Sequence, residues 1–191
     1  MVGIGLDGNE SVGPPALYAE AYALAKKGGL KCTAHCCEDY LTPLQAPPTN
    51  YLICRDVLKC DRIDHGYTVV DEPEFARQCA ERGVLFTVVP TNSHYLRTLP
   101  PQRWAQDHPI RRMPALGLHI HPNTDDPTLH HVTPSRAWSM MVRDFGYSIA
   151  DLRQCLHNGL DSAWIDAATR AAWRADWSAR FDALRAELPD L

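Results

Sequence analysis

Histidine and acidic side chains recur at the ends of short apolar segments of this chain, and these residue types suit metal-assisted hydrolysis. His35 ends one such segment and is followed by Glu38, and His65 and the adjacent pair Asp125 and Asp126 end two others. Imidazole and carboxylate groups are ligands for Zn²⁺ and similar ions. A bound ion lowers the pKa of its water to about 7, and a nearby glutamate can carry a proton to the group under attack.

Each of these residues also has an ordinary structural interpretation. A lone histidine at the end of a strand is more often a satisfied core or loop residue than a ligand. The Asp-Asp-Pro sequence at 125–127 and the glycine at Gly8 are both typical of simple turns. The functional interpretation is favoured because the polar residues form an ordered set, one group after each predicted strand.

Alternating strand-like and helix-like segments must position these residues. The predicted strands are 2–6, 30–35, 62–67, 84–89 and 118–121, and the predicted helices are 16–27, 50–59, 72–82, the partly helical 104–116, 135–145, 148–158 and 161–187. Ser148 with Asp151 three residues later predicts a capping box at the start of one helix. Such alternation favours parallel βαβ units, and hence an α/β fold. Polar residues meet at the carboxyl ends of such strands, here 7–10, 35–38, 65, 91–94 and 123–126.

Composition and charge exclude several classes of protein. The 191 residues are 45% hydrophobic and 22% charged, which suits one globular domain rather than a disordered chain or a coiled coil. With 19 basic and 23 acidic residues the net charge is −4, so we expect no nucleic-acid partner. Because the sequence has no long apolar run and no secretion signal, we expect no membrane partner and a cytoplasmic location.

The seven cysteines are odd in number and irregular in spacing, which favours reduced thiols. Most are expected to be small buried hydrophobic residues. A structural zinc site formed by Cys32, His35, Cys36 and Cys37 is the alternative. It is less favoured, because no second Cys-x-x-Cys pair follows at zinc-finger spacing.

Four ordered segments, 6–10, 33–38, 62–67 and 123–127, resemble the motif series of the adenosine deaminase family, and residues 89–93 and 108–110 also fit. The resemblance covers nearly the whole chain. It implies a partial (β/α)8 TIM barrel, corresponding to strands 4–8 plus the C-terminal helices, with residues 1–191 as a single N-terminally truncated domain. The implied reaction is the metal-dependent hydrolytic deamination of the 6-amino group of a purine.

The resemblance also implies a role for each matched residue. His35 and Asp125 are the zinc ligands. Glu38 protonates the ring nitrogen beside the attacked carbon, and His65 orients and helps to activate the metal-bound water.

Two further residues are implied to meet the substrate. Asp126 bonds a nitrogen of the imidazole ring of the purine, and the backbone amide of Gly8 bonds a nitrogen on the pyrimidine side. The identity of the purine stays open, because adenosine, deoxyadenosine, adenine and N6-substituted forms all present the same edge to these residues.

The chain departs from the family pattern at the metal. The family takes two more zinc ligands from a His-x-His motif in its first barrel strand, which has no match here. The one His-x-His of this chain, His119 and His121, is expected to lie deeper in its strand and to serve packing or interior hydrogen bonding. Two ligands should bind zinc weakly.

Three hypotheses follow from this incomplete ligand set. The favoured one is that the chain acts within a complete protein or with a complementary N-terminal fragment, and is weak alone. The alternatives are an active short aminohydrolase with rearranged ligands, and a non-enzymatic remnant or purine-binding module.

Overall fold

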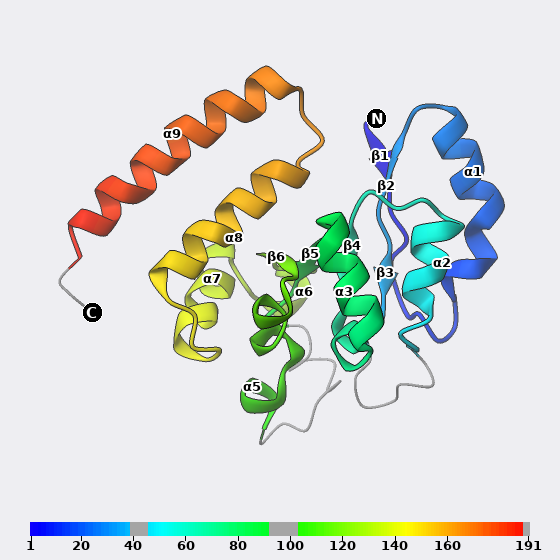
Figure 1. Ribbon diagram of the computed structural model, residues 1–191, viewed down its shortest axis with the longest axis horizontal. Helices are drawn as coiled ribbons and strands as arrows, with labels where there is room; N and C mark the ends of the chain where they lie inside the picture. The colour runs from blue at the N-terminus through cyan, green and yellow to red at the C-terminus, as the bar shows by residue number, and fades with distance from the viewer. Residues whose placement is uncertain (39–45, 92–102, 189–191) are drawn as a thin grey trace.

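The structure is a computed structural model that describes residues 1–38, 46–91 and 103–188. Its parallel strands lie side by side in the order in which they occur in the sequence, and together they form one wall (Figure 1). All the strand pairings are parallel. The strands are β1 (Gly3–Ile4), β2 (Lys31–Cys32), β3 (His35–Cys36), β4 (Ile63–His65), β5 (Leu85–Val88) and β6 (His119–Pro122). Parallel strands whose neighbours in space are also neighbours in sequence are typical of an arc of a (β/α)8 barrel.

The predicted strand 30–35 is wrong in one respect, because it is two short strands. β2 pairs with β1, whereas β3 pairs with β4. The wall continues across the break, since His35 N–H donates to Leu6 O at 2.8 Å and Asp64 N–H donates to Ala34 O at 2.9 Å. Thr33 and His35, two residues apart in this extended segment, both line the interior of the arc.

Helices fill the connections and the region after β6. They are α1 (Ala19–Lys27), α2 (Asn50–Asp56), α3 (Pro73–Arg82), α5 (Trp104–Asp107), α6 (Pro127–His130), α7 (Pro134–Arg143), α8 (Ile149–Ser162) and α9 (Ala167–Ala186), with 3-10 turns η1 (Pro15–Tyr18), η2 (Tyr67–Asp71), η3 (Pro109–Arg111) and η4 (Pro114–Leu116). Each predicted helical region therefore contains helix. The capping box of Ser148 with Asp151 is confirmed at the start of α8.

The predicted start of the last helix is wrong. Residue 161 belongs to α8, which continues to Ser162, and Ala163 is extended. α9 begins only after Asp166, whose side chain accepts the backbone N–H of Thr169 at 2.8 Å. An aspartate that satisfies this otherwise unpaired N–H group defines a helix start, which separates the two helices.

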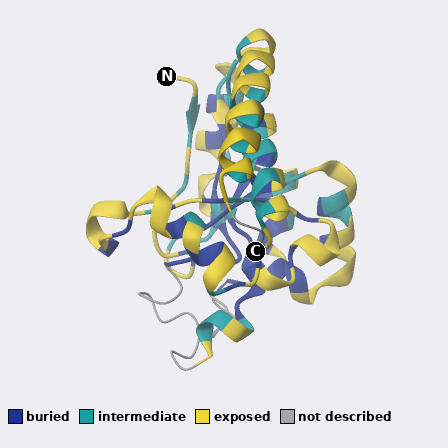
Figure 2. Cartoon of the chain, turned by 90° about the vertical axis from the view of Figure 1, so that its left-hand side faces the viewer, coloured by how far each residue is buried: buried dark blue, intermediate teal, exposed yellow. Residues whose placement is uncertain are grey.

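The hydrophobic core lies between the strands and the outer helices. Its largest fully buried side chains include Tyr22, Tyr51, Phe86, Ile120 and Met141. Figure 2 shows buried residues concentrated at the strands and exposed residues on the outer helices. The other face of the wall is polar, and it forms the site described below. No described helix has the length and apolar character needed to cross a membrane.

The outer strands of the wall, β1 and β6, each have only one strand neighbour within the described residues. Asn123 N–H donates to Val88 O of β5, so the backbone of Ile120, three residues earlier, faces the opposite side of β6. There Asn158 of α8 donates its Nδ2–H to Ile120 O at 3.0 Å. Part of this open edge is therefore satisfied by a side chain instead of a strand.

Candidate active site

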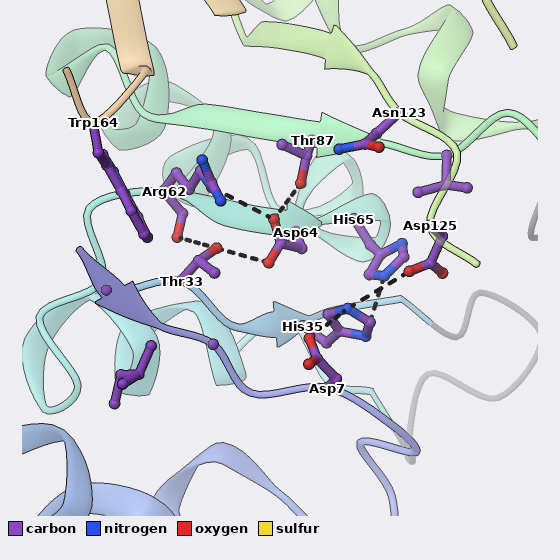
Figure 3. Close-up of a pocket in the computed structure, with 14 residues that line it drawn as sticks. Asp7, Thr33, His35, Arg62, Asp64, His65, Thr87, Asn123, Asp125 and Trp164 are labelled. Atoms are coloured by element: carbon purple, nitrogen blue, oxygen red, sulfur yellow. Dashed lines mark hydrogen bonds and ion pairs between the residues drawn. The ribbon is translucent and has the colours of Figure 1, made fainter. Parts of the chain in front are cut away.

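One cavity of about 370 Å³ extends along the inner face of the strands to their carboxyl ends, and its walls are mostly polar (Figure 3). Asp7, His35, His65, Asn123 and Asp125 lie near the end of their strands and line it. The sequence predicted that strand ends would converge on one site, and the structure brings these together. The predicted contributions of Asn92, Ser93 and His94 lie outside the described residues.

His35 stands between two aspartates in this cavity. Its Nε2 lies 3.3 Å from Asp7 Oδ1 and 4.0 Å from Asp125 Oδ1 (Figure 3). Nitrogen and oxygen ligands each lie about 2.0–2.2 Å from a bound zinc, so two ligands of one ion are separated by roughly 3–4 Å. The two predicted metal ligands therefore face one another at a separation close to that range.

Asp7 had no role in the sequence-based prediction, although it lies in the first polar segment. Gly3, Ile4 and Gly5 of the same segment also line the cavity. Alternation of side chains along this segment would therefore not have singled out Asp7.

His65 connects His35 to Glu38. Its Nε2 lies 3.3 Å from His35 Nδ1, and the two rings meet edge to face with centroids 4.4 Å apart. On the other side, His65 Nδ1 lies 3.7 Å from Glu38 Oε1. His65 is fully buried, and its Nδ1 has no hydrogen-bond partner among the described residues.

This donor set suits a divalent ion such as zinc. Ligand atoms of His35, Glu38 and His65 all lie within 4.8 Å of one another, and Asp125 adds a second carboxylate beside His35. Imidazole and carboxylate groups are ordinary zinc ligands, and the buried Nδ1 of His65 is a polar atom in need of a partner. The less favoured thiol site receives no support, because Cys32 belongs to none of the converging groups found in the described chain.

The protonation of the site follows from burial. Burial lowers the pKa of His65, and the neighbouring His35 lowers it further, so His65 is neutral at pH 7. Burial raises the pKa of Asp125, an effect partly opposed by His65 and His35. A cation beside Asp125 would favour its charged form, because opposite charges stabilise a carboxylate.

Three residues of the site have strained backbones. Cys37, His65 and Asp125 have φ values of 59°, 68° and 57°, in the left-handed region that non-glycine residues rarely occupy. Such conformations cost roughly 1–3 kcal/mol each and cluster at functional sites. The strain lies in the turns that aim His65 and Asp125 into the cavity and carry Glu38 away from β3.

Glu10 fixes the segment that carries Glu38. Its buried carboxylate accepts the N–H of Cys37 at 2.9 Å, the N–H of Glu38 at 3.2 Å and the Nδ2–H of Asn50 at 2.6 Å. Burial raises the pKa of Glu10 from 4.5 to about 7, although these donors act in the opposite direction. The sequence placed Glu10 in a motif without a role, because only the fold brings it beside residues 37 and 38.

Below the predicted metal ligands, the interior of the arc is polar as well. Asp64 accepts the hydroxyl of Thr33 at 2.7 Å and also that of Thr87 (Figure 3). The guanidinium of Arg62 lies over the ring of Trp164, 4.3 Å from its centroid. Trp164 comes from the segment between α8 and α9, so the end of the chain reaches back to the first strands.

The two predicted substrate contacts flank the cavity without lining it. Gly8 is exposed, with φ of 91°, a conformation that favours glycine. Asp126 precedes α6 and is exposed. Their contacts with a purine stay a prediction.

The histidines of the His-x-His motif do not join Asp125. The Nδ1 of His121 lies 3.0 Å from Cys155 O in α8, and its ring packs edge to face on Trp138 of α7. His119 is exposed. His121 therefore has the packing and hydrogen-bonding role that was predicted, whereas the interior position predicted for His119 is wrong, because this first residue of β6 is exposed.

The fold is an arc of a (β/α)8 barrel, and imidazole and carboxylate groups lie at the carboxyl ends of its strands. These features place the chain in the class of (β/α)8 barrels that have a metal site. Known proteins agree with this class. The sequence model of the adenosine deaminase family matches residues 1–176. The chain therefore belongs to the adenosine deaminase family, as its motifs predicted.

Relatives and solved structures extend this result. An adenine deaminase from Cupriavidus necator is 31% identical over 177 residues, which are 92% of this chain and 48% of that protein. An amidohydrolase from Burkholderia ambifaria, crystallised with bound zinc, is 54% identical with a TM-score of 0.90, covering 97% of this chain and 50% of the other. An adenine deaminase from Arthrobacter aurescens is 27% identical, with a TM-score of 0.83 over 94% of this chain and 53% of the other.

These similarities confirm the predicted fold class, a partial TIM barrel. The chain spans about half the length of the relatives and structures that it matches.

Proposed function

We propose that this chain is part of a zinc-dependent purine aminohydrolase, which replaces the 6-amino group of the purine with oxygen. The convergence of His35, Asp125, His65 and Glu38 in one cavity is the observation that carries the proposal. All four come from the matched motifs, and their types are those that metal-assisted hydrolysis requires.

His35 and Asp125 would hold the ion, which supplies a Lewis acid that makes water nucleophilic at neutral pH. The neutral ring of His65 accepts a hydrogen bond from the attacking water and receives its proton, because burial keeps that ring uncharged. His65 Nε2 lies 3.3 Å from His35 Nδ1, so a water beside an ion held by His35 would also be within reach of His65.

Glu38 acts on the purine itself. As a protonated carboxyl group it donates its proton to the ring nitrogen beside C6, which makes that carbon more electrophilic. After water has added to C6, the C6–N bond breaks: the amino group takes the proton held by His65 and leaves as ammonia, and the hydroxyl proton returns to Glu38. Glu10 holds the backbone on which Glu38 stands, so the carboxyl group is aimed before the substrate arrives. Gly8 and Asp126 orient the purine through its ring nitrogens.

The free base adenine is the substrate that the relatives favour. Proteins named adenine deaminase from Cupriavidus and Arthrobacter match nearly all of this chain. Among the purines that the sequence left open, adenine is therefore the first to test, with adenosine as its matched comparison.

The metal site requires the rest of a barrel. A catalytic zinc normally has three protein ligands, and His35 with Asp125 supplies two. β1 and β6 each have an open side within the described chain, where further strands can pair. Residues 1–191 then form one domain-sized portion of the barrel. The remaining strands, in a separate N-terminal fragment or in a longer chain, supply the missing ligands.

Complementation tests this proposal. The purified chain is mixed with zinc and with the half of the Burkholderia ambifaria amidohydrolase that it does not match, and the loss of adenine is followed by ultraviolet absorbance. We expect a zinc-loaded complex that deaminates adenine and very low turnover by the chain alone. A complex that binds zinc and purine without turnover would support the purine-binding module instead.

Two variants of this chain sharpen the test. Glu38→Gln should abolish turnover and leave complex formation and zinc content unchanged, because it removes the proton donor alone. Glu20→Gln is the matched control, since Glu20 is exposed on α1. Equal turnover in both variants would rule out the assigned role of Glu38.

A further inference from the structure

Four of the seven cysteines gather behind the strand that carries His35, outside the cavity. Cys36 Sγ lies 3.1 Å from Cys37 Sγ, and Cys54 in α2 lies close enough to Cys36 and Cys60 for their thiols to shift its pKa. Cys36, Cys37 and Cys54 are fully buried, whereas Cys60 is partly exposed. The cluster therefore forms a chain of thiols that runs from the interior to the surface.

We propose that Cys54 and Cys60 form a reversible oxidation site, at which hydrogen peroxide converts the two thiols to a disulfide. The proposal does not depend on the deaminase chemistry, because neither residue lines the cavity.

The backbone already holds the two cysteines together. Cys60 N–H donates to Cys54 O at 2.9 Å, and each of the two thiols shifts the pKa of the other. A disulfide requires Cα atoms about 4.4–6.8 Å apart and side chains directed at each other. Because this backbone hydrogen bond holds the two residues together across one turn, the disulfide can form through an adjustment of the turn that follows α2.

The two sulfurs differ in a way that suits such a reaction. Hydrogen bonds from Cys36 and Cys60 lower the pKa of Cys54, although burial opposes them, and this favours a thiolate. The pKa of Cys60 is raised, mainly because its thiol donates to Cys54. The thiolate is the reactive form of cysteine. Cys54 is therefore the nucleophile, and Cys60 is the thiol that resolves the intermediate.

The chemistry balances in two steps. The Cys54 thiolate attacks one oxygen of hydrogen peroxide, the O–O bond breaks, and sulfenic acid and hydroxide are formed. Cys60 then attacks the sulfur of this sulfenic acid, the S–O bond breaks, and the hydroxyl group leaves as water with the thiol proton. Protonation of the hydroxide in the first step gives the sum: two thiols and one peroxide yield one disulfide and two waters.

Cys60 is a better partner for Cys54 than Cys36 is. Cys36 belongs to β3, where its carbonyl accepts Gly66 N–H at 2.9 Å, and its thiol also contacts Cys37. Movement of Cys36 would disturb the strand. Cys60 lies in the turn after α2 and is partly exposed, so peroxide reaches the pair from this side and the turn can adjust.

Peptide mapping of the oxidised full chain tests the proposal. The chain is treated with one equivalent of hydrogen peroxide, its remaining thiols are alkylated, and it is cleaved after Lys and Arg and then after Glu38. These cuts leave Cys54 as the only cysteine of peptide 39–55 and Cys60 as the only cysteine of peptide 60–62. We expect these two peptides to be joined, with two of the seven thiols lost and both restored by dithiothreitol.

Two variants complete the test. Cys60→Ser, at the partly exposed position, should form no disulfide and should leave a sulfenic acid on Cys54 that dimedone traps. Cys155→Ser is the control, since Cys155 is buried in α8 far along the chain, and it should oxidise like the wild type. Seven intact thiols after peroxide, or a link between peptide 60–62 and peptide 32–38, would overturn the proposal.

Discussion

The carboxylate of Glu10 accepts the backbone N–H of Glu38 at 3.2 Å, so one buried glutamate holds the peptide that carries the other. The same carboxylate accepts Cys37 N–H, which fixes a residue with φ of 59°. An unfavourable backbone conformation next to a catalytic group persists only where the surroundings hold it. Glu10 is therefore a positioning residue for the proposed proton donor.

Removal of this carboxylate should destabilise the protein. Glu10→Ala leaves two buried N–H groups and the Asn50 side chain without their acceptor, and each loss of this kind costs about 1–3 kcal/mol. We expect the free energy of unfolding to fall by about 2–4 kcal/mol in urea titrations at pH 7. Glu20→Ala on the surface of α1 should change it by less than about 0.5 kcal/mol. Equal effects of the two changes would contradict the role of Glu10.

Glu10 should also make stability depend on pH. Its pKa is about 7 in the folded chain and near 4.5 when exposed, so between these values the folded state binds more protons than the unfolded state. Stability from this group is therefore complete below about pH 4.5 and falls as the pH rises through 7. The contribution of His65 to the pH dependence of stability has the opposite sign, because burial lowers its pKa and the unfolded state binds its proton more readily.

The variant Glu10→Gln separates these effects. Relative to this variant, the wild type should lose up to about 3 kcal/mol of unfolding free energy as the pH rises from 4.5 to 8. Urea titrations at several pH values measure it. A difference that is constant with pH would show that Glu10 titrates normally.

Zinc binding should depend on His35 and not on the His-x-His motif. His35→Ala removes one of two predicted ligands, so we expect the zinc affinity of the full chain to fall at least tenfold in competition with a chromogenic chelator. His119→Ala is the matched control, because His119 is an exposed histidine of β6, and its zinc affinity should equal that of the wild type. Loss of zinc in the His119 variant would instead support a rearranged ligand set.

Tyr67 should contribute to stability through its hydroxyl group. The phenol oxygen accepts Val89 N–H at 2.9 Å, and Tyr67 is fully buried between His65 and His108. Tyr67→Phe keeps the ring but leaves this N–H unpaired, so we expect a loss of about 1–2 kcal/mol in urea unfolding. Tyr18→Phe, at a partly exposed position, should have little effect.

Local sequence patterns were sufficient for the order of elements and for the motif residues. Apolar runs that alternate with helix-forming segments predicted all five strand regions, and the side chains that follow them predicted His35, His65 and Asp125 in one cavity. These features depend on neighbours in the chain and on the topology of (β/α)8 barrels, in which the carboxyl ends of all strands lie at the same end of the barrel. Two boundaries were missed from the sequence, the one between β2 and β3 and the one between α8 and α9. Both depend on hydrogen bonds whose partners are distant in the chain or have only a weak sequence pattern.

Tertiary structure alone decided which residues act on one another. Asp7 beside His35, Glu10 beneath Glu38 and Cys54 beside Cys60 are contacts that no spacing rule predicts, since they depend on how strands, helices and turns pack. Burial, which sets the protonation of Glu10 and His65, is also a property of the assembled fold. The sequence by itself determined the kind of chemistry through the types of its side chains, and packing determined the distances and the dielectric surroundings in which that chemistry would take place.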